Sequence, residues 1–237
     1  CNDGVRDFDF PLLNQSASVQ SVSEAQEDYT RHMIDMAAYF SAQDGVPSTA
    51  LVAIEAEGNG AKSDSQSWAN QGYILSSEID CARHFLWNFR SIKNILATKE
   101  ETRKFTNNYE WANVLHDEHD TRYQMMFDYY LSRGYTESAA SNAADADADD
   151  YVYNAREYLY AYCATSRSFF DSIFSDANIM DFYNNGAGRD ATDREFWWDN
   201  AAKKRAFTCA KQHNQLILNE SQVTVSIRDS IYGSGEW

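Results

Sequence analysis

Helix breakers are scarce in this chain, which has only two prolines and ten glycines among 237 residues. A strand-rich sandwich needs such residues in its many turns. Apolar and aromatic side chains recur instead at three- and four-residue steps, the spacing that places them on one face of a helix, within 23–42, 98–133 and 151–173. The sequence therefore predicts a mainly α fold, an irregular bundle of about six to eight helices with at most a minor β element.

The length of the chain favours one substantial core with an appended arm over two domains. We expect an extended arm over 1–22, a helical domain over 23–221 and a strand-like tail over 222–237. The tail is expected to form a strand because Val223, Val225 and Ile227 alternate with polar residues.

Several local patterns predict where helices begin and end. Glycines within 58–67 predict a flexible loop, which is placed to cover a site. The alternating aspartates of 145–150 fail the sequence pattern of a helix-loop-helix calcium site and indicate a solvated acidic bend between two helices. Capping boxes of the Ser/Thr-x-x-Glu/Asp type predict helices that begin near Ser77, Thr98 and Thr192.

The first of two polar motifs reads Asp-Cys-Ala-Arg-His-Phe-Leu-Trp-Asn. On a helix, Asp80, His84 and Asn88 fall four residues apart on one stripe, with Arg83 beside it. Asp80 can then orient His84 and support its charge, as a histidine requires when it acts as a general base or a metal ligand. The alternative is a capping aspartate followed by a histidine that is hydrogen-bonded within the core.

The second motif, about a hundred residues later, reads Met-Asp-Phe-Tyr-Asn-Asn-Gly-Ala-Gly-Arg. We expect a helix that ends in a glycine-bearing loop, because Asn184, Asn185 and the glycines tolerate positive φ, while Asp181 and Arg189 bracket the turn. An ordinary helix C-cap is the alternative. Polar groups among so many aromatics must satisfy one another. We therefore expect the motifs to meet, with Asp181 beside His84.

Together the motifs resemble a helical domain, of uncharacterised biochemical function, found at the C-terminal ends of some bacterial polymorphic toxins and in other secreted bacterial proteins. The resemblance covers about residues 50–195. A middle family element, Phe-x-x-x-His-Glu, is matched by Phe105 and Glu110, but Tyr109 stands where the family has histidine. This departure weighs against any mechanism that needs two histidines. The matched positions of the other elements are Asp80, Arg83, His84, Trp87, Asn88, Met180, Asp181, Asn184, Asn185, Gly188 and Arg189.

The resemblance implies a shared fold and site but assigns no reaction. The residues themselves suggest an effector-type hydrolase that acts on an envelope component, with His84 as base or ligand supported by Asp80, Glu110 as a second acid or base, and Asp181 placing substrate or water. A non-catalytic binding or assembly subunit, in which the cluster only clamps helices, is the alternative. The expected substrate-binding residues are Arg83, Asn88, Asn184, Asn185 and Arg189.

No cofactor is expected in the first interpretation. A divalent metal held near His84, Glu110 and Asp181 is the alternative, and its carboxylate-rich ligands suit a hard or borderline cation. His116 and His119 also suggest a metal site, but they lie three residues apart and lack the spacing of the common helical zinc motif. His119 falls on an apolar stripe, which favours a core histidine.

The net charge of the chain and its N-terminal residues suggest a partner class and a cellular location. A net charge of −16, from 20 basic and 36 acidic residues, disfavours a nucleic-acid partner. Cys1 and the polar arm that follows it resemble a bacterial lipoprotein after removal of its signal peptide. An arbitrary start or half of a disulfide is the alternative. We therefore expect a secreted or lipid-anchored protein of the bacterial cell envelope or exterior.

The partner and thiol predictions follow from the same features. The membrane would be met only through a lipid on Cys1, and the tail over 222–237 is the expected contact for a protein partner. The remaining cysteines, Cys81, Cys163 and Cys209, allow either one disulfide with one thiol or three reduced thiols.

Overall fold

The computed structural model describes residues 22–93, 96–195, 199–235 and 237. Within these ranges the protein is built from α-helices with two short 3-10 turns and contains no strand, which confirms the mainly α fold. The helices are α1 (Val22–Gln43), α2 (Ser48–Asn70), α3 (Ile79–Lys93), α4 (Lys99–Ser132), α5 (Glu137–Thr165), α6 (Arg167–Ile173), α7 (Asp176–Ala191), α8 (Asn200–Gln212) and α9 (Val225–Ser234), and the 3-10 turns are Ser76–Glu78 and Glu220–Gln222.

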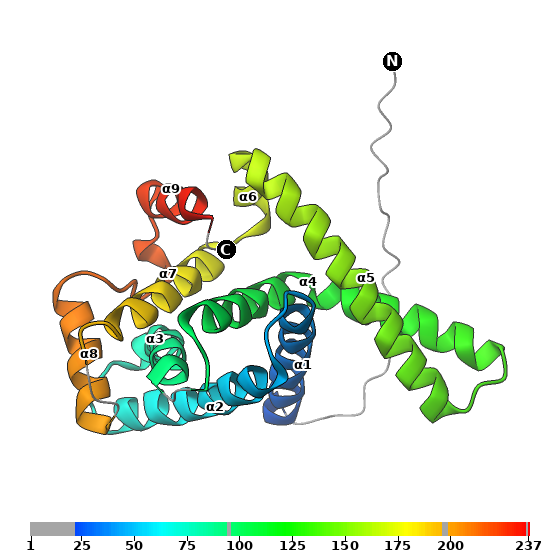
Figure 1. Ribbon diagram of the computed structural model, residues 1–237, viewed down its shortest axis with the longest axis horizontal. Helices are drawn as coiled ribbons and strands as arrows, with labels where there is room; N and C mark the ends of the chain where they lie inside the picture. Colours follow the sequence, from blue (N-terminus) through cyan, green and yellow to red (C-terminus); the bar gives the residue numbers. More distant parts are fainter. Residues whose placement is uncertain (1–21, 94–95, 196–198, 236) are drawn as a thin grey trace, which may run out of the picture.

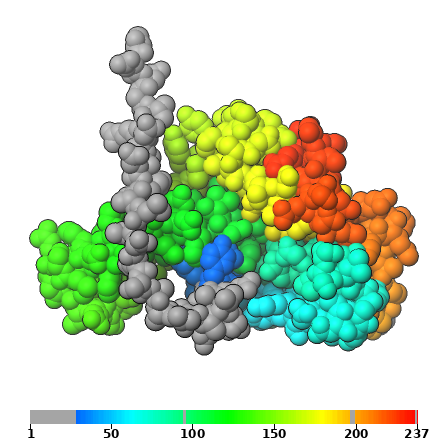
Figure 2. Space-filling view, turned by 180° about the vertical axis from the view of Figure 1, so that it is seen from behind, coloured from blue at the N-terminus to red at the C-terminus, as the bar shows by residue number. Residues whose placement is uncertain are grey.

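The two longest helices, α4 and α5, form an antiparallel hairpin (Figure 1). Its tip projects from the rest of the molecule, as the view from behind also shows (Figure 2). Gly134 follows α4 with a φ of +86°, a conformation that glycine adopts without the steric cost of a Cβ. At the other end of the hairpin, α1, α2, α3 and α7 pack around α4 and build the body of the protein.

An alanine stripe holds the hairpin together. Ala140, Ala144, Ala148 and Val152 are four residues apart and fully buried, and they lie on α5, which packs along α4. Small side chains at this spacing allow the two helices to approach closely. The predicted acidic bend over 145–150 is therefore wrong, because this segment lies within the continuous helix α5, with Ala148 buried and the aspartates exposed or half-buried.

Helix α2 also replaces a predicted loop. The segment 58–67 lies within α2, and its glycines provide room for side chains of α3. A Cβ on Gly58 would lie 2.8 Å from the indole of Trp87, and one on Gly60 would overlap the guanidinium of Arg90. The Trp87 indole N–H donates to the carbonyl oxygen of Ile54 at 2.7 Å. These glycines are thus packing positions rather than a cover for the site.

The predicted helix starts agree with the structure only in part. The Thr98 capping box is confirmed, since Thr98 Oγ1 accepts from the backbone N–H of Glu101. The start near Ser77 is displaced, because the helical turn begins at Ser76, where the Glu78 carboxylate accepts from the backbone N–H of Leu75 at 3.2 Å. The start at Thr192 is wrong, because this residue ends α7, whereas α8 begins after Asp199, whose carboxylate accepts from the N–H of residue 202.

The C-terminal tail is helical, so the predicted strand is wrong. Val225 and Ile227 belong to α9, and Thr224 caps this helix by accepting from the N–H of Ile227. The alternation of valines with polar residues here spans the end of a 3-10 turn, a cap and the first turn of a helix. Trp237 returns the chain to the core, where its ring packs against Phe170 and Trp111.

Two further findings concern the thiols and the membrane. Cys81, Cys163 and Cys209 are free, and the first two are buried while the third is exposed. No helix in the described ranges is both long enough and apolar enough to cross a bilayer. Cys1 and the arm over 1–21 lie outside the described residues.

Candidate functional site

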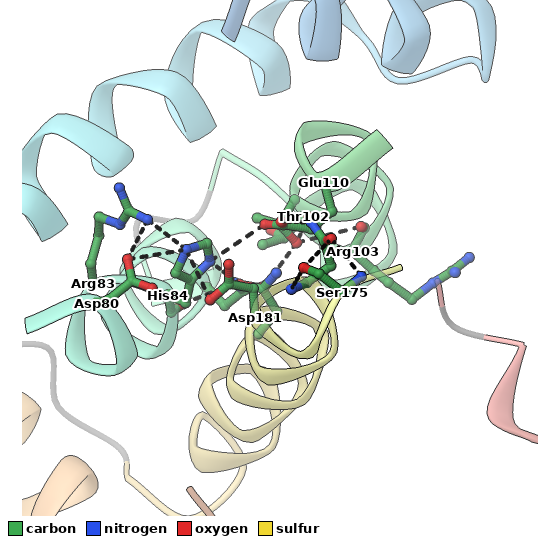
Figure 3. A network of polar contacts seen from close by, with 12 residues as sticks. Asp80, Arg83, His84, Thr102, Arg103, Glu110, Ser175 and Asp181 are labelled. Atoms are coloured by element: carbon green, nitrogen blue, oxygen red, sulfur yellow. Dashed lines mark hydrogen bonds and ion pairs between the residues drawn. The ribbon is translucent and has the colours of Figure 1, made fainter. Parts of the chain in front are cut away.

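Three helices converge on His84. Helix α3 supplies His84 itself, α7 supplies Asp181, and α4 supplies Glu110 (Figure 3). His84 Nε2 lies 3.3 Å from Asp181 Oδ1, and His84 Nδ1 lies 3.7 Å from Glu110 Oε1. The predicted meeting of the two polar motifs is confirmed, although the junction is a crossing of two helices.

The crossing of α3 and α7 depends on a glycine. The segment from Asn184 to Gly188 is helical, so the predicted loop with positive φ is wrong. Gly188 lies against the backbone carbonyl of Phe85, with Asn88 alongside, and a Cβ at this position would overlap that carbonyl oxygen. Glycine is therefore needed for close backbone approach, which brings the polar faces of α3 and α7 within hydrogen-bonding reach.

The hydrogen bonds of His84 define its tautomer. Arg83 Nη2 lies 2.8 Å from His84 Nε2, and a guanidinium can only donate, so Nε2 is the acceptor. On the other side of the ring, Asn185 Oδ1 lies 3.2 Å from His84 Nδ1 and also accepts from Asn88 Nδ2 at 2.7 Å. This network places the proton on Nδ1 and leaves a lone pair on Nε2.

Burial keeps the imidazole neutral. His84 is 1% exposed, and this burial, followed by the positive charge of Arg83, lowers its pKa to about 4. A neutral histidine is the form that accepts a proton, and its Nε2 lone pair here accepts a hydrogen bond from Arg83. The site therefore contains a base that is unprotonated at neutral pH.

Two nearby carboxyl groups are shifted in the opposite direction. Burial raises the pKa of Glu110 to about 8, against the attraction of Arg83. Burial, followed by the charges of Glu110 and Asp80, raises the pKa of Asp181 well above its ordinary value. Glu110 is thus able to carry a proton at neutral pH. The raised pKa of Asp181 favours its protonated form, in which the carboxyl group can donate toward His84 Nε2.

The third carboxyl group behaves differently. Asp80 forms an ion pair with Arg83, and its Oδ1 lies 3.8 Å from His84 Nε2. Although burial opposes it, the neighbouring His84 and Arg83 hold the pKa of Asp80 below its ordinary value. The side chains of Asp80 and Arg83 are 46% and 31% exposed, which makes this ion pair the solvent-facing edge of the site.

A set of amides and hydroxyls lies on the inner side of the site. Asn88 is fully buried, and its Oδ1 accepts from Thr106 at 3.2 Å and from Arg189 Nη1 at 3.1 Å. Asn178 Nδ2 lies 3.4 Å from Glu110 Oε2. The sequence analysis pointed to neither Thr106 nor Asn178, and Asn178 also closes the cap that begins at Ser175.

One expected site residue points elsewhere. Asn184 Nδ2 donates to the carbonyl oxygen of Ile217 at 2.8 Å, and Asn184 Oδ1 accepts from the N–H of Ile217 at 3.0 Å. Asn184 therefore fastens the segment after α8 to α7. Arg189 reaches only the Asn88 end of the cluster in these contacts.

Several buried polar atoms of the site have no hydrogen-bond partner among the described residues. They include Glu110 Oε1, Asp181 Oδ1 and Asn185 Nδ2, all of which belong to residues around His84. A buried polar atom without a partner is costly and uncommon in a cluster that serves only to hold helices together.

The site has some of the donor geometry that a metal ion requires. Asp80, His84 and Asp181 each present a potential ligand atom within 4.8 Å of the others. However, the Arg83 guanidinium already donates toward the Nε2 lone pair that a metal would need, and it adds positive charge beside that atom. The arrangement suits an anion or a proton-transfer reaction better than a second cation.

Comparisons with known proteins give no family. No protein-family profile, curated protein or solved structure matches this chain.

Proposed function

We propose that the chain is a hydrolase-type enzyme that uses His84 as its general base. The single observation that carries this proposal is the position of His84 Nε2, 3.3 Å from Asp181 Oδ1, in a buried cluster where the pKa of His84 is lowered and those of Glu110 and Asp181 are raised. Groups shifted in opposite directions are characteristic of acid–base catalysis, because one can accept a proton while another donates it near neutral pH.

In the proposed mechanism, the substrate draws the Arg83 guanidinium away from His84 Nε2. This nitrogen then removes a proton from a water or hydroxyl group that approaches along the Asp80–Arg83 edge. Asp181, 3.3 Å from the same nitrogen, carries the proton that the leaving group requires. Arg83 is placed to stabilise negative charge that develops on the substrate. Asn185 holds the imidazole in the required tautomer through its contact with Nδ1.

The proposed substrate is a component of the bacterial envelope. Support for this class comes from the resemblance of the two polar motifs to domains of secreted bacterial proteins. A secreted or lipid-anchored location belongs to the same proposal.

A structural clamp is the second candidate. It is favoured by the full burial of Asn88 and Asn185, which connect α3, α4 and α7 through hydrogen bonds that contribute to stability without any reaction. The clamp and the enzyme predict different results when His84 and Asp181 are replaced.

The discriminating experiment incubates the purified full chain with isolated bacterial envelopes and measures released soluble fragments by mass spectrometry. Wild-type protein is expected to release fragments, while His84→Gln and Asp181→Asn reduce the rate by about 100-fold or more. Thermal unfolding of both variants is followed in parallel, so that loss of activity is separated from loss of fold.

His213→Gln is the matched control, because His213 is an exposed histidine at the end of α8, and it is expected to retain full activity. Absence of fragment release by the wild-type chain would contradict envelope hydrolysis. A large fall in melting temperature for both site variants, together with unchanged release per folded molecule, would favour the clamp.

A further inference from the structure

A second polar cluster contains three histidines and lies closer to the C-terminal end of α4 than Glu110 does. It combines His32 from α1 with His116 and His119 from α4, and Asp120 lies beside all three. The centroid of the His32 ring is 4.8 Å from that of His116 and 4.3 Å from that of His119. None of these residues takes part in the contacts described around His84.

We propose that His32, His119 and Asp120 form a binding site for a divalent transition-metal ion of the zinc type, which joins α1 to α4. Each of these residues offers one ligand atom, and the three atoms lie within 4.8 Å of one another. Asp120 Oδ1 is 3.4 Å from His32 Nδ1 and 3.8 Å from His119 Nδ1.

These separations are near those of a tetrahedral site. With metal–ligand distances of about 2.0–2.1 Å, neighbouring ligand atoms lie about 3.3 Å apart. The 3.4 Å distance between His32 Nδ1 and Asp120 Oδ1 meets this value. A small side-chain rotation of the exposed Asp120 would shorten the 3.8 Å distance from its Oδ1 to His119 Nδ1 to the same value. Two imidazoles with one carboxylate are ligands that zinc and related borderline cations accept.

His119 is the strongest sign of a ligand. It is only 2% exposed, and each of its ring nitrogens lies close to a carboxylate oxygen without the geometry of a regular hydrogen bond. Its Nε2 lies 3.3 Å from Asp149 Oδ1, which leaves Nδ1 facing Asp120 and His32. A carboxylate behind a ligating histidine is the usual outer partner that orients the ring on a metal.

The surroundings suit a cation that arrives from solvent. The side chains of His32 and Asp120 are 26% and 56% exposed, so the site opens to the surface. Asp120 and Asp149 place two carboxylates around His119, and they favour a positive charge at this position. His116 Nε2, 3.2 Å from His32 Nδ1, is placed to approach the ion as a further nitrogen ligand.

The test uses the full chain, stripped with a chelator and then dialysed. Zn²⁺ binding is measured by calorimetry, and Co²⁺ is added separately because its visible absorption reports the ligand geometry. We expect one ion bound per chain at this site, and a binding constant weakened by at least about 10–100-fold in His32→Asn and Asp120→Asn. Asp149→Asn is expected to weaken binding by about 10-fold or more.

His213→Asn is the control and is expected to bind like the wild type. Circular dichroism of the metal-free variants verifies that they fold, and the half-exposed His32 and exposed Asp120 make their variants the most tolerant of substitution. The proposal is overturned if the wild-type chain binds no Zn²⁺, if His32→Asn and Asp120→Asn bind with unchanged affinity, or if binding disappears only in His84→Asn.

Discussion

Gly188 of α7 lies directly on the backbone carbonyl of Phe85 in α3, with no room between them for a side chain. The contact sets the separation of the two helices that carry Asp181 and His84. The chemistry of the site therefore depends on a residue that has no functional group.

Replacing Gly188 by alanine is expected to lower the free energy of unfolding by about 1–3 kcal/mol, because the new Cβ overlaps the Phe85 carbonyl oxygen and forces the helices apart. The higher helix propensity of alanine, worth about 1 kcal/mol, offsets this only in part. Chemical denaturation measures the change.

Gly186→Ala is the matched control on the same helix. A Cβ there would meet only the end of the Arg189 side chain, at 3.7 Å. This variant is expected to be neutral or stabilised by up to about 1 kcal/mol. Equal effects of the two substitutions would mean that the helix crossing does not require a glycine.

Glu110→Gln is expected to change how stability depends on pH. The folded-state pKa of Glu110, about 8, lies above the unfolded value of 4.5, so the folded protein binds the extra proton between these pH values. The contribution of Glu110 to stability is then complete below pH 4.5 and is lost as the pH rises toward 8, with a slope approaching about 1.4 kcal/mol per pH unit.

The lowered pKa of His84, about 4, acts in the opposite sense and adds stability as the pH rises from 4 to 6.5. The effect of Glu110 should therefore be most visible between pH 6.5 and 8. Denaturation of wild type and Glu110→Gln across this interval should show a shallower decline for the variant. Parallel curves for the two proteins would mean that Glu110 is ionised throughout.

Asn184→Ala is expected to reduce stability rather than act selectively on the reaction. The amide pairs with both backbone groups of Ile217, and its loss leaves two buried polar groups unsatisfied at about 1–3 kcal/mol each. Asn142→Ala, on the exposed face of α5, is expected to change stability by less than about 0.5 kcal/mol. A stable Asn184→Ala protein that has lost activity would return Asn184 to the substrate-binding set.

The free thiols are expected to differ in reactivity. Burial raises the pKa of Cys81 strongly and that of Cys163 to about 11, whereas Cys209 is exposed. Alkylation of the native protein, followed by peptide mass mapping, should label Cys209 first and the other two only after denaturation. Rapid labelling of Cys81 in the native state would show that α3 opens readily.

The site could be located from sequence because its residues follow helical spacing. Asp80, His84 and Asn88 repeat at four-residue steps, and burial of their polar groups required partners, which Asp181 and Asn185 provide. The tautomer and the pKa shifts were beyond prediction, because they depend on the position of Arg83 and on the depth of burial.

Glycine was the main source of error. At Gly58 and Gly188 the residue makes room for a neighbouring helix, and the local sequence of such a position is indistinguishable from that of a loop. The sequence singled out His116 and His119 but not His32, which precedes His116 by 84 residues and shows no pattern of its own.

Helix α4 runs without interruption from Lys99 to Ser132, so Glu110 and His119 stand on one stiff rod about 14 Å apart along its axis. A sliding or rolling movement of this rod displaces both side chains in concert. A contact that fixes α4 at one of the two polar clusters therefore also restrains the position of the other cluster.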